Sequence, residues 1–147
     1  MPVLQAESRR RHQAGGQRLV VSEGSYPVSL PRAFSADFAP DSLAMIRRGL
    51  SVPVVIGANM YDPAAQDAFN SAILLDGDGR AVGRYDKVQL LAFGEYIPAV
   101  DAFPWLRKLL PASIGRFTAG KGPGVLTLRG SGNEVWNLGP VICYEDI

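Results

Sequence analysis

The sequence predicts an α/β fold built around one mixed β-sheet. Three features indicate it: short apolar runs of strand length, one helical spacing of apolar residues between two such runs, and glycine-rich turns between others. Strand-helix-strand units place parallel strands in a sheet, whereas hairpins place antiparallel ones. The two together predict a mixed sheet with helices packed against it.

In the first half of the chain we predict helix, strand, helix and strand, over residues 2–16, 19–23, 41–50 and 52–58. The first helix ends at a Gly-Gly pair, and Glu23 marks the end of the first strand. Asp41 can cap the second helix, whose apolar residues recur at helical spacing.

Two hairpins are predicted in the second half. Residues 68–75 and 80–85 flank Asp76-Gly77-Asp78-Gly79, and residues 125–129 and 135–143 flank a turn at Gly132-Asn133. The chain stops just after the last strand, where an α/β sheet would continue into a covering helix. We therefore expect residues 1–147 to be a partial domain, incomplete at both ends.

Composition excludes several functional classes. With 147 residues, 47% of them hydrophobic, and 15 Lys and Arg against 14 Asp and Glu, the chain is neither disordered nor basic enough to bind nucleic acid through a general field. A single cysteine permits no internal disulfide. The longest apolar stretches fall short of the roughly 18 to 20 residues of a membrane helix, and no signal peptide opens the chain.

Scarce residue types exclude other chemistries. His12, the one histidine, lies in an arginine-rich stretch without partners for a catalytic triad, and one His with one Cys cannot supply a zinc site. Residues 115–122 come close to a phosphate-binding loop, but Gly122 stands where the pattern needs a hydroxyl, and Pro123 follows. We expect neither a metal nor a nucleotide.

Cys143 is the informative residue, because it stands where a buried strand meets the next element. That position can project a nucleophile with backbone N–H groups behind it, although a buried structural cysteine is the common alternative. Without a histidine, a carboxylate has to accept the thiol proton; the candidates are Glu23, Glu95 and Glu145. A cation near the sulfur would favour the thiolate and neutralise an oxyanion, and Lys87 follows a predicted strand.

These residues, in their order along the chain, resemble the Glu-Lys-Cys set of the nitrilase (carbon-nitrogen hydrolase) superfamily. The segments are Val20 to Pro27 around Glu23, Tyr85 to Pro98 around Lys87, and Ile142-Cys143-Tyr144-Glu145. Phe93-Gly94-Glu95-Tyr96-Ile97-Pro98 is similar to the apolipoprotein N-acyltransferase branch. Soluble amidases usually carry a His two residues after the Lys, where this chain has Gln89. The family commonly has Trp-Pro before the Glu, and this chain has Val21-Ser22.

The resemblance implies an α-β-β-α sandwich and acyl transfer through a cysteine thioester. Glu23 would act as base and Cys143 as nucleophile, with Lys87 and the Tyr144 backbone N–H stabilising the oxyanion. Glu95 would orient Lys87, and Glu145 would support the site. The acyl donor would be a phospholipid and the acceptor the N-terminal amine of a diacylglyceryl lipoprotein, with no metal or diffusible cofactor. The domain would face the periplasm, anchored in the inner membrane by helices outside this chain.

The long stretch 87–124 is rich in Gly and Pro yet carries many aromatic residues, and loops of this length are usually functional. By the resemblance, an acyl groove or a membrane contact would form from Phe93, Tyr96, Ile97, Phe103 and Trp105. Ordinary packing over the sheet is the alternative. Two other functions stay open: a soluble nitrilase-type amidase with the same three residues, and a catalytically silent fragment.

Overall fold

The computed structural model describes residues 19–20, 26–98, 103, 105, 108, 117–129 and 134–146. The predicted helix over residues 2–16, the carboxylate of Glu23 and the turn at Gly132-Asn133 lie outside these residues. In the part of the chain that the structure describes, no helix is long and apolar enough to cross a membrane.

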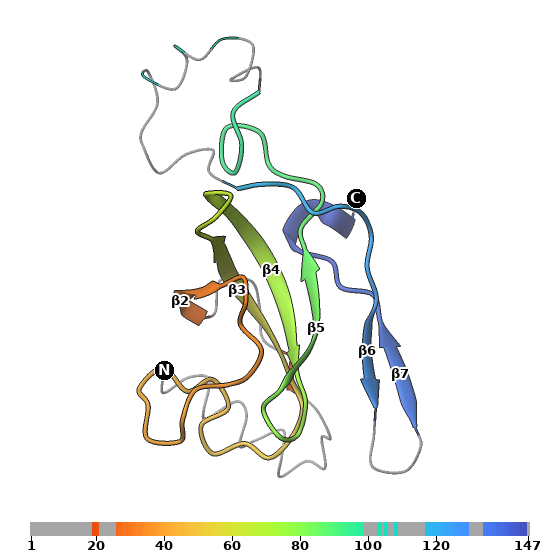
Figure 1. Ribbon diagram of the computed structural model, residues 1–147. Helices are drawn as coiled ribbons and strands as arrows, with labels where there is room; N and C mark the ends of the chain where they lie inside the picture. The colour runs from red at the N-terminus through yellow and green to blue at the C-terminus, as the bar shows by residue number, and fades with distance from the viewer. Residues whose placement is uncertain are drawn as a thin grey trace.

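A five-stranded mixed sheet forms the centre of the described structure (Figure 1). Its strands are β1 (Leu19–Val20), β2 (Tyr26–Pro31), β3 (Val54–Asp62), β4 (Asp67–Leu75) and β5 (Ala81–Asp86). β1 and β2 both run parallel to β3 along one of its edges, β4 is antiparallel to β3, and β5 is antiparallel to β4. The predicted mixture of parallel strands and a hairpin is therefore confirmed.

Both faces of the sheet are apolar, because β3 and β4 bury residues on either side. Face A carries a cluster that includes Ile56, Met60 and Ile73, and the segment after β2 packs on it through partly buried side chains such as Phe34 and Leu50. Face B carries a second cluster around Leu74 and Tyr85. Alternation along each strand decides which side chains reach which face.

A second sheet, the hairpin of β6 (Leu126–Arg129) and β7 (Val135–Leu138), covers face B beside β5 (Figure 1). Leu126 and Leu128 are buried in the face B cluster together with Ile142. The close approach depends on Gly83 of β5, since a Cβ there would stand 3.0 Å from the Leu126 Cδ2 atom.

The predicted tight turn between β4 and β5 is confirmed, and hydrogen bonds within the turn itself hold it. The Asp76 carboxylate accepts hydrogen bonds from the Asp78 and Arg80 N–H groups, and Gly79 adopts a φ of 87°. Glycine reaches that conformation without the steric penalty of a side chain.

The helix predicted over residues 41–50 is wrong, because this segment forms successive turns. The Asp37 carboxylate accepts hydrogen bonds from the backbone N–H groups of Phe38, Ile46 and Arg47. Gly49 has a φ of 74°. Asp37 lies nine residues before Ile46 and ten before Arg47, and its carboxylate binds N–H groups that would form i to i−4 bonds in a helix. The spacing of apolar residues does not reveal this competing contact.

The strand predicted over residues 135–143 is also too long. β7 ends at Leu138, before Gly139 and Pro140, and proline has no N–H group for a sheet ladder. Cys143 instead begins a short 3-10 helix, η2 (Cys143–Asp146), which lies beside the end of β5 (Figure 1).

Candidate active site

Lys87 is the first residue after β5, and its side chain lies on face B. Its backbone N–H donates to the carbonyl of Asn70 at 2.8 Å, which continues the β4–β5 ladder by one residue. Asp86, the preceding residue, bonds to Ser71 on face A, so Lys87 must point the other way. The Lys87 side chain is only 2% exposed, an unusual position for a charged group.

Glu95 provides the negative charge that holds Lys87. The Lys87 Nζ atom lies 2.9 Å from Glu95 Oε1, and the Asn70 side-chain amide donates to the same oxygen at 3.2 Å. Glu95 Oε2 accepts the Leu91 N–H at 2.8 Å. The role expected for Glu95, orienting Lys87, stays a prediction.

The surroundings of Glu95 keep its carboxylate charged. Burial alone would raise the pKa of Glu95, but the Leu91 N–H, the Lys87 ammonium and the Asn70 amide outweigh burial, and the pKa is lowered. Glu95 is therefore an anion at neutral pH and a weak proton acceptor.

Cys143 is exposed and has a φ of 58°. Three non-glycine residues in the described parts of the chain have positive φ: Gln66, Phe93 and Cys143. A left-handed conformation at such a residue costs about 1 kcal/mol or more, so surrounding contacts must hold it. Strain of this kind is common at reacting groups.

Glu145 supplies those contacts and ties the two segments together. Its Oε2 atom accepts the Ile142 N–H at 2.9 Å, next to Cys143. Its Oε1 atom accepts the N–H groups of Val88 and Gln89 at 2.6 and 3.0 Å, directly after Lys87. One partly buried carboxylate thus fixes the cysteine segment against the lysine segment.

Tyr85 completes this set from β5. Its hydroxyl donates to Glu145 Oε1 at 2.8 Å. Burial raises the pKa of Glu145, yet the donors from Gln89, Ile142, Tyr85 and Val88 overcome it, and the pKa is lowered. Burial, followed by the bond to Glu145, raises the pKa of Tyr85 to about 12. Tyr85 is neutral and Glu145 is charged at any physiological pH.

Glu23, the third predicted catalytic residue, lies outside the described residues, so its placement stays a prediction. The described neighbours on either side are both paired with β3: Val20 with Val55, and Tyr26 with Ala58. Val20 and Tyr26 are six positions apart in the sequence, whereas their partners in β3, Val55 and Ala58, are three positions apart. Tyr144 lies in η2, and nothing is described of its side chain.

The predicted substrate-contact residues divide into two groups. Phe93, Tyr96, Phe103 and Trp105 expose between 39% and 64% of their surface, whereas Ile97 is 5% exposed and belongs to the interior. The Leu91 carbonyl accepts the N–H groups of Gly94, Glu95 and Tyr96, which closes a compact turn with Phe93 at its outer side. Ile97 is thus placed to anchor this turn rather than to meet a substrate.

Three residues at the site were not predicted from the sequence. Asn70 is a buried polar residue in β4, between Phe69 and Ser71. Tyr85 is buried in the face B cluster, and the sequence assigned it no role of its own. Gly120 donates its N–H to the Lys87 carbonyl at 2.8 Å, and a Cβ there would fall 2.1 Å from the Asp86 oxygen, so a side chain does not fit.

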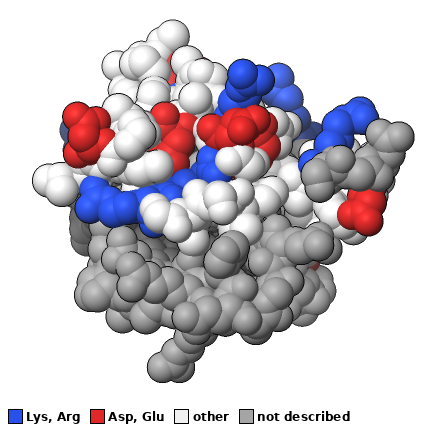
Figure 2. Space-filling view, turned by 90° about the horizontal axis from the view of Figure 1, so that it is seen from below, with Lys and Arg blue, Asp and Glu red and all other residues white. Residues whose placement is uncertain are grey.

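The described residues show a surface of mixed charge and no cluster of metal ligands. Figure 2 shows Lys and Arg lying close to Asp and Glu on the face drawn, without a large area of one sign among the coloured residues. In the described ranges, no group of three His, Cys, Asp or Glu side chains is arranged to hold a metal ion. Among these residues, Glu95 holds the Lys87 ammonium, and Glu145 joins the segment after Lys87 to the segment of Cys143.

The chain is similar to one protein family and to individual curated proteins. Residues 41–147 match the carbon-nitrogen hydrolase family. The chain is 39% identical to an apolipoprotein N-acyltransferase of Bdellovibrio bacteriovorus, over 67% of this chain and 19% of that protein. It is 36% identical to one of Sinorhizobium fredii, over 92% of this chain and 26% of that protein.

The chain spans about a fifth to a quarter of the length of these curated relatives. Among solved structures, Nit3 of Saccharomyces cerevisiae, a member of branch 10 of the nitrilase superfamily, matches with a TM-score of 0.49 at 14% identity, over 93% of this chain and 46% of that protein. That structural likeness is too low to support a conclusion, whereas the family match covers most of the chain. This chain belongs to the carbon-nitrogen hydrolase family.

Proposed function

We propose that the chain carries the reacting centre of an N-acyltransferase that moves an acyl chain from a phospholipid to an amine. One observation carries the proposal: Glu145 binds the residue before Cys143 and the two residues after Lys87. A cysteine segment and a lysine segment joined by one carboxylate suit attack on a carbonyl followed by stabilisation of its oxygen. The names of the curated relatives support the choice of substrates.

In the first half-reaction, Glu23 accepts the thiol proton and the Cys143 sulfur attacks the ester carbonyl carbon of the phospholipid. The oxyanion accepts hydrogen bonds from the Lys87 ammonium and the Tyr144 backbone N–H. The tetrahedral intermediate then breaks its ester C–O bond. The lysophospholipid alkoxide takes the proton back from Glu23, and a thioester remains on Cys143.

In the second half-reaction, the N-terminal amine of a diacylglyceryl lipoprotein attacks the thioester carbonyl. Glu23 accepts one amine proton, the C–S bond breaks, and an amide forms. The proton returns to the sulfur, so the enzyme is regenerated. No metal or diffusible cofactor takes part in either step.

Glu23 is the preferred base because the other two candidate carboxylates are already engaged. Glu95 and Glu145 each accept several hydrogen bonds, and the pKa of both is lowered, which makes them weak bases. Their role is to position Lys87 and Cys143.

A phospholipid donor requires contact with a bilayer. Exposed aromatic side chains at Phe93, Tyr96 and Trp105 suit such a contact, since aromatic rings favour the membrane interface. In the full-length protein we place this domain on the periplasmic side of the inner membrane, anchored by segments outside this chain.

The proposal is tested by incubating the full-length protein with phospholipid and measuring its intact mass. We expect a mass increase of one acyl chain, located on Cys143 by peptide mapping and lost on addition of a lipoprotein amine. An adduct that forms with small amides, and never with phospholipid, would favour the soluble amidase instead. Labelling at a residue other than Cys143 would refute the assignment of the nucleophile.

A further inference from the structure

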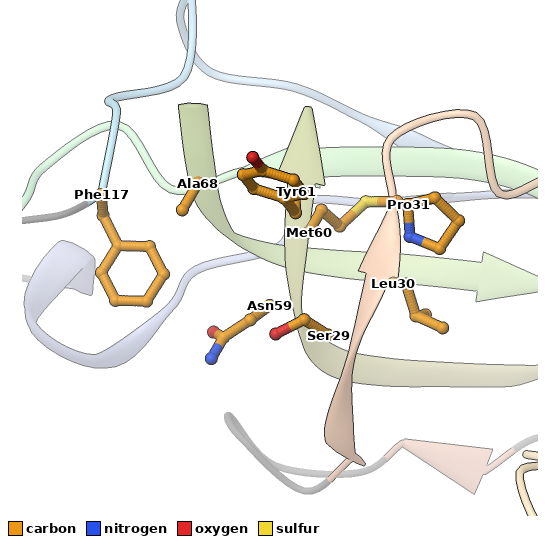
Figure 3. Close-up of a pocket in the computed structure, with 8 residues that line it drawn as sticks. All are labelled: Ser29, Leu30, Pro31, Asn59, Met60, Tyr61, Ala68 and Phe117. Atoms are coloured by element: carbon orange, nitrogen blue, oxygen red, sulfur yellow. The ribbon is translucent and has the colours of Figure 1, made fainter. Parts of the chain in front are cut away.

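A pocket of about 480 Å³ lies at the end of the main sheet, outside the predicted catalytic residues. It is lined by residues of β2, β3 and β4 together with Phe117. In the view of Figure 3, Phe117 and Ala68 lie toward one end and Leu30 and Pro31 toward the other, with Asn59 and Ser29 between them. Its volume falls within the range of small-molecule sites.

The pocket adjoins the Lys87 site on the same face of the sheet. Asn59, which lines it, is the cross-strand partner of Asn70, and paired residues present their side chains to the same face. The Asn70 amide donates to Glu95, which holds Lys87. Asn59 is two strand spacings from Lys87, or about 10 Å.

Phe117 connects the other end of the pocket to the same carboxylate residue. Its backbone N–H donates to the Glu95 carbonyl at 3.0 Å, and it forms a β-bridge with Ala68. Glu95 therefore contacts Lys87 and Asn70 through its side chain and Phe117 through its main chain. Lys87 and the pocket thus share Glu95 as a common neighbour.

The lining selects an uncharged, apolar occupant. Pro31, Ala68 and Phe117 give the lining apolar side chains, Ser29, Asn59 and Tyr61 add polar groups, and none of the lining residues is charged. Leu30 and Met60 also border the pocket, but their side chains are buried in the face A cluster. A phosphate headgroup or an ammonium would lose its hydration there without a compensating partner, whereas a hydrocarbon chain would gain from leaving water.

We propose that this pocket holds the hydrocarbon tail of the acyl group that is transferred, and that Ala68 and Ser29 limit its length. The inference rests on the proposed acyl transfer. The acyl tail would lie on the surface of the sheet, and the exposed aromatic turn around Phe93 would contact the bilayer.

The test compares two phosphatidylethanolamines, dioctanoyl and dipalmitoyl, as donors to the full-length protein in detergent. The rate of acyl-adduct formation on Cys143 is measured for the wild type and for Ala68→Leu and Ser29→Leu, which narrow the pocket from two sides. We expect the ratio of dipalmitoyl to dioctanoyl rates to fall by about tenfold in each, the scale of one methylene misfit in an apolar pocket.

Two further variants make the result specific. Val82→Leu adds bulk at an exposed position of β5 and should leave the ratio unchanged. Phe93→Asn removes the aromatic ring while keeping a residue that tolerates positive φ, and it should slow both donors alike.

An unchanged ratio in both pocket variants, with normal acylation by the wild type, would overturn the pocket assignment alone. If the wild type forms no adduct with either phospholipid, the acyl-transfer proposal fails and this inference fails with it. Ser29 is exposed, so its variant reports on the pocket even where Ala68→Leu lowers stability.

Discussion

Asp86 and Lys87 are neighbours in the chain, yet they form ion pairs on opposite faces of the sheet. Asp86 pairs with Arg32 at 2.9 Å on face A, and Lys87 pairs with Glu95 at 2.9 Å on face B. Arg32 also lies over the Phe69 ring, at 3.7 Å from its centroid. The face A pair joins β2 to β5 over the core.

The face B pair has different neighbours, and in the proposed function that difference separates a structural pair from a catalytic one. Lys87 is 2% exposed, against 24% for Arg32. Only the segment after Lys87 is bound by Glu145, which also holds the strained Cys143 segment. Charge and hydrogen bonding are alike on both faces; what differs is that Glu145 joins the segment after the face B cation to the segment of Cys143, the proposed nucleophile.

The largest effect is expected at Cys143. Cys143→Ala removes the sulfur and should abolish acyl-enzyme formation, while an exposed side chain leaves little packing to lose. Intact mass after incubation with phospholipid measures the adduct, and thermal unfolding checks that the variant folds. Persistent acylation would mean that the nucleophile lies elsewhere.

Lys87→Met tests the face B cation, and Arg32→Met is its match on face A. Losing one oxyanion stabiliser should slow acylation by about 100-fold or more. Arg32→Met should lower the melting temperature while the folded enzyme keeps a rate close to that of wild type. Equal losses of acylation rate in both variants would contradict the claim that only the face B ion pair takes part in the reaction.

Glu95→Gln removes the charge that compensates buried Lys87. Breaking a buried pair by removing one partner destabilises a protein by up to about 3 kcal/mol. Urea unfolding of the full-length protein measures this change. We also expect the single-turnover rate of acylation to fall in Glu95→Gln and to recover in part in Glu95→Asp. That pattern would show that Glu95 acts by positioning Lys87.

Gly120→Ala tests the tight backing of the Lys87 segment. A Cβ would stand 2.1 Å from the Asp86 carbonyl oxygen, so the backbone must shift, at a cost of about 2 kcal/mol. At Gly139 no atom lies within 4 Å of the corresponding Cβ, so Gly139→Ala is the matched control and should be nearly neutral. Comparable destabilisation by both substitutions would contradict the described packing.

The smallest effect concerns pH. The pKa of Glu95 and of Glu145 is lowered from 4.5 in the folded state, so their stabilisation is complete above that value and is lost as the pH falls through the lowered values. Glu145→Gln should therefore flatten the loss of stability on acidification. Denaturation monitored from neutral to acidic pH measures the slope, and an unchanged slope would contradict the assigned environment.

The sequence predicted those parts of the fold and site that depend on neighbouring residues. The expected role of Glu95 rests on the resemblance of the segment Tyr85 to Pro98, and the turn at residues 76–79 is set by its own Asp and Gly. The helix over residues 41–50 failed because Asp37, outside that window, binds its N–H groups. Asn70 and Gly120 reach the site only through strand pairing and loop packing, which spacing cannot reveal.

The most direct test is an experimental structure of the full-length protein that resolves the side chains of residues 23, 87 and 143. Our account predicts the Glu23 carboxylate and the Lys87 Nζ atom both within about 6 Å of the Cys143 sulfur, close enough for each charge to act on the thiol. A Glu23 carboxylate on face A, or a sulfur directed away from Lys87, would contradict it.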